Sequence, residues 1–385
     1  MRTTTFIIFY SIVLLVYFLV NYYIFTRGWQ ALGSFPKGRN LYLVVFLFLS
    51  LSYIAGRVLE RYWLGPPVNF LLWTGSFWLG AMIYFVLFLV LIDLVRLVNL
   101  AVPVIPSAWH ENIDQTKVIL FTVIVPAVFL IIVSAHLNTW FPRVNRMEIS
   151  LDGKNSEMSS VNMVLVSDIH MGSLTSKKRI TRMVNRINSL NPDIILLAGD
   201  ILDEDVRPVI QRDLGTAIKN LSAPLGVYGI TGNHEYIGGI NKAADYLTSH
   251  RIHLLRDSVI KVNNSFYLAG REDLTSERFD GKQRKSAEEL LAQIEDDLPV
   301  ILLDHQPFNL DRAAAAGADL QLSGHTHHGQ LWPFNFITRA VYTISRGFGE
   351  VDGMKVYVSN GIGTWGPPMR LGNRPEIVFI KADLN

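Results

Sequence analysis

Five short clusters of histidine, aspartate and asparagine residues are the part of the sequence best equipped for chemistry. In chain order they are Ser167-Asp168-Ile169-His170, Gly199-Asp200, Gly232-Asn233-His234-Glu235, Asp304-His305 and Gly324-His325-Thr326-His327. Six of the ten histidines lie in or directly beside these clusters. The chain has no cysteine, so thiolate metal sites, cysteine nucleophiles and disulfides are excluded. Imidazole, carboxylate and amide ligands without sulfur suit Mn, Fe, Zn or Co.

The clusters follow short apolar runs that we interpret as strands of an α/β domain. The expected strands are 161–167, 193–199, 226–231, 265–269, 299–304, 319–323, 355–359 and 376–381. Two amphipathic segments, 177–190 and 286–295, indicate helices between them, and Ser286 with Glu289 forms a capping-box pattern at the start of the second. Ligands of open α/β sheets bind at the carboxyl ends of strands. All five clusters are therefore expected to converge on one crevice.

Any one of these clusters can occur by chance in an unrelated protein. Their joint occurrence in this order, with glycines beside several of them, is a much more specific signal. Together they resemble the calcineurin-like metallophosphoesterase family, whose pattern runs Asp-x-His, Gly-Asp, Gly-Asn-His-Asp/Glu, His, Gly-His-x-His. The resemblance covers roughly residues 160–380. Its last block is closest to a membrane-associated bacterial branch ending Gly-His-Thr-His-Gly-Gly-Gln. The resemblance implies a layered β-sandwich flanked by helices and the hydrolysis of phosphoesters by two divalent metal ions.

Carried over by this resemblance, the conserved positions of the pattern divide into two ligand sets. Asp168, His170 and His327 would bind one ion, Asn233, His305 and His325 the other, and Asp200 would bridge both. The spacing fits, because residues two apart on an extended strand end point the same way. A bridging carboxylate holds two ions about 3.5–4 Å apart, which suits a clamp on a phosphoryl group.

Four further residues receive predicted roles around these ligands. His234 is expected to protonate the leaving oxygen as the catalytic acid, the alternative being a loop cap. Asp203 is a candidate to orient an imidazole, with a solvated turn carboxylate as the alternative. His328 stands where the branch has glycine and either lines the site or faces outward. Arg370 is a candidate phosphate contact, because a guanidinium can fork two oxygens, or else a surface arginine.

The first part of the chain is predicted to lie in a membrane. Four stretches, 3–26, 40–56, 62–92 and 118–142, carry no charged residue, and about 20 apolar residues cross a bilayer. We therefore expect a four-helix transmembrane domain, 1–142, followed by a phosphoesterase domain, 143–385, in a multi-pass protein of the cell membrane. The Lys and Arg flanking the spans number six against five, which leans only weakly to a cytoplasmic catalytic domain and leaves the side undecided.

The composition leaves three functional hypotheses open. The second part is near neutral, with 27 basic and 29 acidic residues, so no nucleic-acid partner is expected. The leading hypothesis is a membrane-integral phosphoesterase acting on a membrane-resident or lipid-linked substrate, for which a UDP-diacylglucosamine-like pyrophosphate is one candidate by resemblance. The alternatives are a tethered phosphodiesterase or phosphatase for soluble substrates, and a non-catalytic metal-binding sensor or transporter. The oligomeric state stays unknown.

Overall fold

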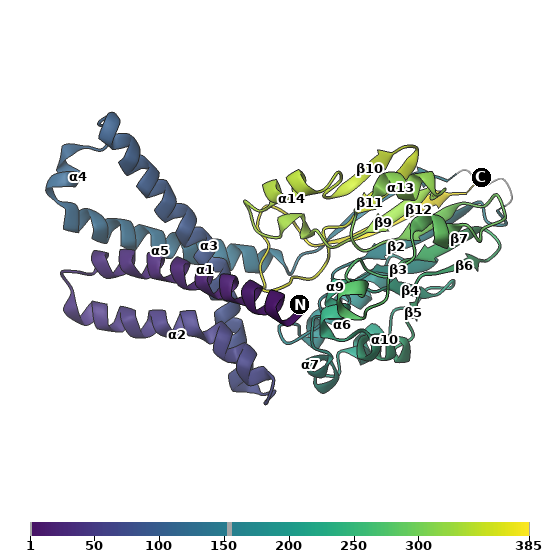
Figure 1. Cartoon of the computed structure of the whole chain (residues 1–385), viewed down its shortest axis with the longest axis horizontal. Coiled ribbons are helices and arrows are strands. Elements are labelled where there is room, and N and C mark those ends of the chain that lie inside the picture. The colour runs from purple at the N-terminus through teal and green to yellow at the C-terminus, as the bar shows by residue number, and fades with distance from the viewer. Residues whose placement is uncertain (1, 152–155, 385) are drawn as a thin grey trace. The chain divides into compact units, whose positions relative to one another are not determined.

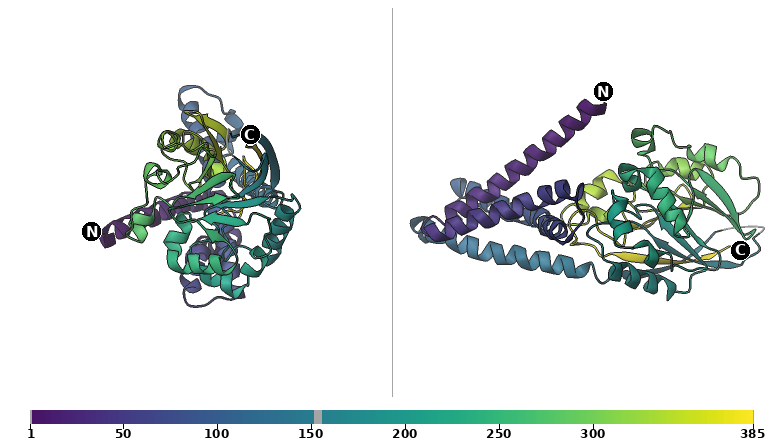
Figure 2. Two further views of the ribbon diagram at one scale, coloured as in Figure 1. Left: turned by 90° about the vertical axis from the view of Figure 1, so that its right-hand side faces the viewer. Right: turned by 90° about the horizontal axis from the view of Figure 1, so that it is seen from below.

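The chain forms two compact units, which we describe from a computed structural model of residues 2–151 and 156–384. The first unit is Met1–Ala135 and the second is His136–Asn385. The domain boundary that we placed after residue 142 stays a prediction. Figures 1 and 2 show long helices in the first unit and layered strands with shorter helices in the second.

The first unit contains the apolar helices predicted from the charge-free stretches. They are α1 (Arg2–Ala31), α2 (Pro36–Glu60), α3 (Pro66–Ala101), the short α4 (Ser107–Glu111) and α5 (Ile113–Asn138), whose last three residues belong to the second unit. Pro36 and Pro66 open α2 and α3, where proline's missing N–H costs nothing. All but α4 are long and apolar enough to cross a membrane. The protein is therefore a membrane protein with four candidate spans.

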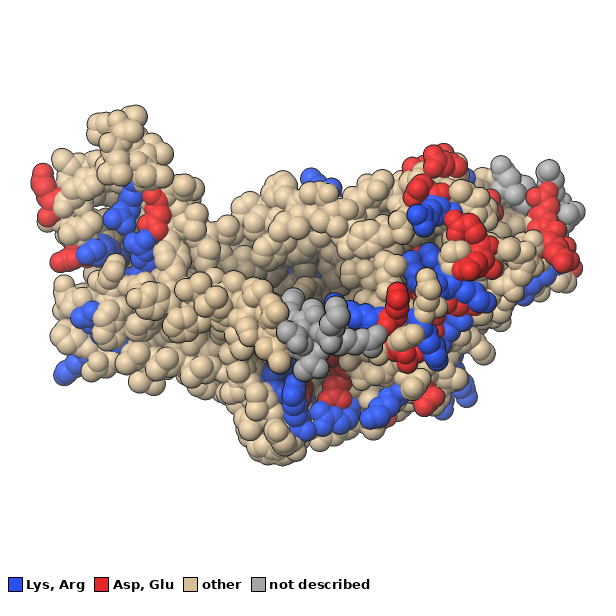
Figure 3. All heavy atoms as spheres, viewed as in Figure 1, with Lys and Arg blue, Asp and Glu red and all other residues tan. Residues whose placement is uncertain are grey.

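Polar side chains inside this unit are paired with one another. Asp93 forms ion pairs with Arg27 at 2.5 Å and with Arg96 at 3.5 Å, and it accepts a hydrogen bond from the Tyr23 hydroxyl. In Figure 3 most of this unit's surface carries no charge, and a group of blue and red side chains lies at its far left. This distribution is typical of helices surrounded by lipid.

The second unit is built on two six-stranded sheets. In spatial order, the first contains β1 (Arg143–Ser150), β12 (Glu376–Asp383), β2 (Ser160–Val166), β3 (Ile194–Ala198), β4 (Val227–Ile230) and β5 (His253–Leu254). The second contains β10 (Gly347–Val351), β11 (Met354–Val358), β9 (Leu320–Ser323), β8 (Val300–Leu303), β7 (Phe266–Gly270) and β6 (Ser258–Val262). Strands β2 to β5 are parallel, as are β7, β8, β9 and β11.

Three hydrophobic cores place these sheets between layers of helices. Leu196 of β3 packs with Leu268 of β7 and Leu322 of β9, so one core lies between the two sheets. The outer face of the first sheet packs on α6 (Lys177–Asn188) and α10 (Ile240–Ser249), and that of the second on α12 (Ala287–Leu291) and α13 (Leu310–Ala315). Figure 1 shows α6 and α10 on the opposite side of the strands from α13. The layered β-sandwich flanked by helices is confirmed.

The remaining helices are short and lie in the loops between strands. They are α7 (Val206–Gln211), α8 (Gly215–Ile218), α9 (Asn233–Gly238), α11 (Ser276–Phe279), α14 (Asn335–Val341) and the 3₁₀ turn His327–Gly329. The capping box of Ser286 and Glu289 is present at the start of α12. All eight predicted strands occur, while β1, β5, β6 and β10 were not predicted.

Candidate metal centre

The five clusters meet at the carboxyl ends of β2, β3, β4, β8 and β9. Asp168 and His170 follow β2, Asp200 follows β3, and Asn233 opens α9 after β4. The remaining three, His305, His325 and His327, follow β8 and β9. The structure thus brings together all seven side chains that the resemblance assigns to metal binding, from positions up to 159 residues apart.

One ligand set surrounds a point beside β2. Potential ligand atoms of Asp168, His170 and His327 lie within 4.8 Å of one another. The Nε2 atoms of His170 and His327 are 3.0 Å apart, and Asp168 Oδ1 lies 3.4 Å from His327 Nε2. Two imidazoles and a carboxylate this close can share one cation.

The other set lies beside it. Ligand atoms of Asp200, His305 and His325 also lie within 4.8 Å of one another. His325 Nδ1 is 2.9 Å from the amide oxygen of Asn233, which adds the fourth donor. Asp200 Oδ2 lies 3.2 Å from His305 Nε2 and 3.9 Å from His170 Nε2, so this carboxylate is adjacent to both sets.

The ligand positions carry unusual backbone conformations. Asp168, His170, Asp200, His325 and His327 all have left-handed φ angles between 45° and 69°. Such conformations cost L-residues free energy and persist only where the surrounding structure enforces them. Their concentration at one site is typical of functional residues.

Two glycines allow the ligand loops to approach one another. Gly199 has a φ of +83°, and a side chain there would meet the imidazole of His305, with Nδ1 at 2.5 Å. A side chain at Gly232 would collide with Asp200 Oδ1. Any larger residue would push apart the loops that carry Asp200, Asn233 and His305.

The donor set fits divalent cations. Asp168, Asp200 and His305 are almost completely buried, and buried charge requires a compensating partner. His305 Nε2 is buried without a hydrogen bond although it lies 3.2 Å from Asp200 Oδ2, while the other ring nitrogen, Nδ1, lies 2.7 Å from the Ala198 backbone oxygen. A buried imidazole nitrogen without a hydrogen-bond partner, beside a carboxylate, is what coordination of a metal ion would require.

Burial and neighbouring charges shift the pKa values of the predicted ligands in different directions. Burial raises the pKa of Asp168 to about 6 and lowers that of His170 to about 3. Burial opposes charge on Asp200 and His305 as well, but their mutual attraction outweighs it. The pKa of Asp200 lies well below its usual range and that of His305 well above. His305 is thus an imidazolium when no cation occupies the site.

His234 and Asp203 form a pair at the edge of this cluster. His234 Nδ1 lies 3.0 Å from Asp203 Oδ1, and the His234 backbone N–H donates to Asp200 Oδ1 at 2.9 Å. Burial disfavours the imidazolium, but the charges of Asp200 and Asp203 raise the pKa of His234 to about 10. Ligand atoms of His170, Asp203 and His234 also lie within 4.8 Å of one another, so Asp203 is adjacent to a ligand imidazole.

Arg370 is buried against a predicted ligand. Its Nη2 lies 2.9 Å from His327 Nδ1, its Nε and Nη2 donate to Gly363 O, and its Nη1 donates to Asn373 Oδ1. Burial and the Arg370 charge hold the pKa of His327 well below its usual range. A substrate contact by Arg370 stays a prediction.

His328 is buried but is not within ligand distance of the three sets of residues described above. Its Nδ1 lies 3.3 Å from the Ser345 hydroxyl, and burial with nearby Arg346 lowers its pKa to about 4. It is therefore a neutral imidazole at physiological pH. Its predicted contact with substrate stays a prediction.

Sequence reasoning gave no role to Glu235, which connects two ligand loops. Its carboxylate accepts hydrogen bonds from the backbone N–H groups of Asp200 at 3.2 Å, Leu202 at 2.7 Å and Gly232 at 2.8 Å. Burial raises its pKa to about 7. The Glu three residues after Gly232 is a capping-box signal that could have identified the bond to Gly232 but not the other two.

Comparison with known proteins agrees with this geometry. A family model described as calcineurin-like phosphoesterase matches residues 161–329. An uncharacterized metallophosphoesterase of Aquifex aeolicus is 33% identical over 249 residues, which are 64% of this chain and 94% of that protein. A transmembrane protein with metallophosphoesterase domain of Danio rerio is 32% identical, covering 62% of this chain and 57% of that one. A UDP-2,3-diacylglucosamine pyrophosphatase of Chlamydia trachomatis is 24% identical, covering 68% and 96%.

Metal binding is expected to release protons. His305 carries a proton in the metal-free protein because its pKa is raised, and it must lose that proton to become a ligand. Mn²⁺ affinity should therefore increase as pH rises through neutrality. Calorimetric titration of the full chain in two buffers of different ionisation enthalpy measures the protons released. A heat independent of buffer would contradict this assignment.

Glu235→Gln is expected to loosen the ligand loops. The amide keeps one acceptor oxygen of two, so at least one buried backbone N–H loses its partner, at a cost of about 1–3 kcal/mol. Mn²⁺ affinity should fall with the midpoint of denaturant unfolding. The matched control is Glu277→Gln at an exposed position, expected within about 0.5 kcal/mol of wild type. Equal stability of the two variants would show that the three hydrogen bonds do not support the site.

Proposed function

The chain belongs to the calcineurin-like phosphoesterase family, and from that premise we propose that it hydrolyses a phosphoester or pyrophosphate bond of a membrane-resident or lipid-linked substrate. It is a metal-dependent phosphoric ester hydrolase. The observation that carries the proposal is the convergence of the seven predicted ligands with Asp200 adjacent to both sets.

In the proposed site, this chain's residues would hold two divalent ions. Asp168, His170 and His327 would hold one, Asn233, His305 and His325 would hold the other, and Asp200 would contribute to both. When bound, the ions supply positive charge for the transferring phosphoryl group and an activated water. Mn, Fe, Zn and Co all suit this mixture of imidazole, carboxylate and amide donors.

His234 would donate the proton that the leaving oxygen requires. Without bound ions, the charges of Asp200 and Asp203 raise the pKa of His234 to about 10, which favours the imidazolium form that a general acid needs. Asp203 fixes the ring by accepting from Nδ1, which leaves Nε2–H as the donating atom. General acid catalysis of this kind contributes about 10²–10⁴ in rate.

The membrane-bound nature of the protein favours a lipid-linked substrate. Trp365 is about half exposed, and its ring centroid lies 6.5 Å from that of His234. An exposed apolar surface beside the proposed acid suits an acyl or prenyl chain better than a freely soluble nucleotide. The name of the Chlamydia trachomatis relative, a UDP-2,3-diacylglucosamine pyrophosphatase, supports the same substrate class.

Two other functions stay open. A soluble phosphodiester or phosphomonoester would use the same ligands, with the spans acting as a tether. A sensor or transporter would need the metal ligands but would have no use for the protonated His234 beside them. The membrane face of the catalytic unit and the oligomeric state are not assigned.

His234→Asn is expected to slow poor leaving groups most. Turnover of a glycerophosphodiester, which releases an alkoxide, should fall about 10²–10⁴-fold, because the alkoxide needs the proton. Bis-p-nitrophenyl phosphate should lose much less, since nitrophenolate leaves without one. Steady-state kcat on both substrates measures the difference. An equal fall on both would show that His234 supports the site without acting as the acid.

Trp365→Ala is expected to separate lipid-linked from soluble substrates. KM for a diacyl nucleotide-linked substrate should rise about tenfold, consistent with loss of one buried aromatic contact, while bis-p-nitrophenyl phosphate is unaffected. Phe336→Ala, at a similarly exposed aromatic of α14, is the matched control. Asp200→Asn should abolish metal-dependent turnover of both substrates. Unchanged KM for the lipid substrate in Trp365→Ala would favour the tethered enzyme with a soluble substrate.

A further inference from the structure

A cavity of about 600 Å³ lies in the second unit, apart from the predicted metal ligands. It opens between β1 and β10, which are edge strands of the two sheets. Its volume is in the range of small-molecule sites. Its lining comes from the end of α5, from β1, β10 and β11, and from the loop leading into β12. None of the seven predicted ligands lines it.

The charge of this cavity is unbalanced. Arg143, Arg346 and Arg374 line it, all three are exposed, and none forms an ion pair within residues 2–151 and 156–384. Glu376 is the single carboxylate in the lining. It is already occupied, because it accepts hydrogen bonds from the Asn360 backbone N–H at 2.7 Å and from the Asn145 amide. The lining therefore has a formal charge of +2 and three guanidiniums free to bind an anion.

Two features of the lining favour a lipid as its ligand. Asn138 lines it and is the last residue of α5, one of the helices able to span a bilayer. Phe348, also in the lining, is 52% exposed and presents an apolar ring at the rim. The end of a span lies where lipid head groups meet water, so head groups and the upper parts of acyl chains are the closest candidates for occupancy.

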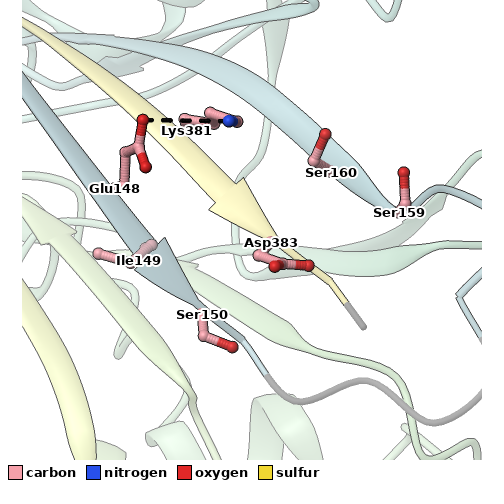
Figure 4. A pocket seen from close by; sticks show the side chains of 7 residues that line it. All are labelled: Glu148, Ile149, Ser150, Ser159, Ser160, Lys381 and Asp383. Carbon is pink, nitrogen blue, oxygen red and sulfur yellow. Dashed lines mark ion pairs between the residues drawn. The ribbon is translucent and has the colours of Figure 1, made fainter.

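A second hollow of the same unit provides a contrast. It is about 440 Å³ in volume and lies where β1 and β12 end and β2 begins (Figure 4). Its charged lining residues are Glu148, Lys381 and Asp383, with Lys381 3.9 Å from Glu148. The formal charge there is −1, so this hollow, unlike the cavity that contains the three arginines, does not attract anions.

We propose that the cavity between β1 and β10 binds the phosphodiester head group of an anionic glycerophospholipid, of which phosphatidylglycerol is one example. The three guanidiniums bind the phosphate, and Phe348 contacts the glycerol and acyl region. This lipid site is separate from the metal centre. The proposal does not depend on which substrate the metal centre hydrolyses.

Occupancy of this site would also affect the loop next to the metal ligands. Asn138 Nδ2 donates to the backbone oxygens of Arg370 at 3.0 Å and of Asn373 at 2.7 Å. Asn373, which lines the cavity, donates in turn to the backbone oxygen of His327 at 3.0 Å. A bound lipid would thus contact the residues that hold the His327 loop in place.

Native mass spectrometry of the full chain in neutral detergent, with dioleoylphosphatidylglycerol added, tests the proposal. The wild type should retain one tightly held phosphatidylglycerol. The triple variant Arg143→Gln, Arg346→Gln, Arg374→Gln should bind it at least about tenfold more weakly, because each cation near a membrane contributes to anion attraction. The matched control neutralises three exposed cations elsewhere in the same unit, Arg186→Gln, Lys219→Gln and Lys242→Gln, and should bind as the wild type does.

A lysine variant, a second lipid and inorganic phosphate serve as further controls. Lysine at the three arginine positions retains the charge and should restore most of the binding, which separates lost binding from misfolding. Retention of phosphatidylglycerol by the glutamine variant, or equal loss in the control variant, would overturn the proposal. So would equal retention of phosphatidylcholine. Protection of the chain from heat by inorganic phosphate alone, at the concentration where the lipid protects, would assign the cavity to a free anion and overturn the lipid assignment.

Discussion

Burial of negative charge beside imidazoles is the constraint on which the rest of the second unit depends. Asp168 and Asp200 are shielded from water, and a carboxylate in a protein interior is stable only with a cation or several donors close by. Without an ion, the proton on His305 offsets Asp200. The left-handed backbone at Asp168 and Asp200, and the hydrogen bonds from two loops to Glu235, hold the arrangement in place. The packed sheets position the strand ends that carry these ligands, and so stabilise the buried charge and the unfavourable backbone conformations.

Much of this organisation could be predicted because it follows from local sequence patterns. Apolar runs bounded by polar clusters marked the eight buried strands, including β3 and β8, whose side chains are buried throughout. The rule that ligands gather at the carboxyl ends of strands predicted that Asp200 and His305 would meet. The absence of charge over about 20 residues marked each span. The assignment of individual residues to two metal ions stays a prediction carried by resemblance.

What could not be predicted depends on partners distant in the sequence. Strand β1 is mostly polar and exposed, its alternation is interrupted at Asn145 and Arg146, and among the described residues it pairs with β12, more than 200 residues later, so its sequence resembles a linker. Strand β10 contains two glycines and is defined by its neighbour β11. Arg370 meets His327 from 43 residues away, and Asp93 pairs with Arg27 in another helix. No local pattern specifies contacts of this kind.

Anomalous diffraction from crystals of the full chain grown with Mn²⁺ tests the central claim most directly. Our account predicts two anomalous peaks about 3.5–4 Å apart with the Asp200 carboxylate between them, one peak beside Asp168, His170 and His327 and the other beside Asn233, His305 and His325. A single peak, or two peaks that do not share Asp200, would contradict the account.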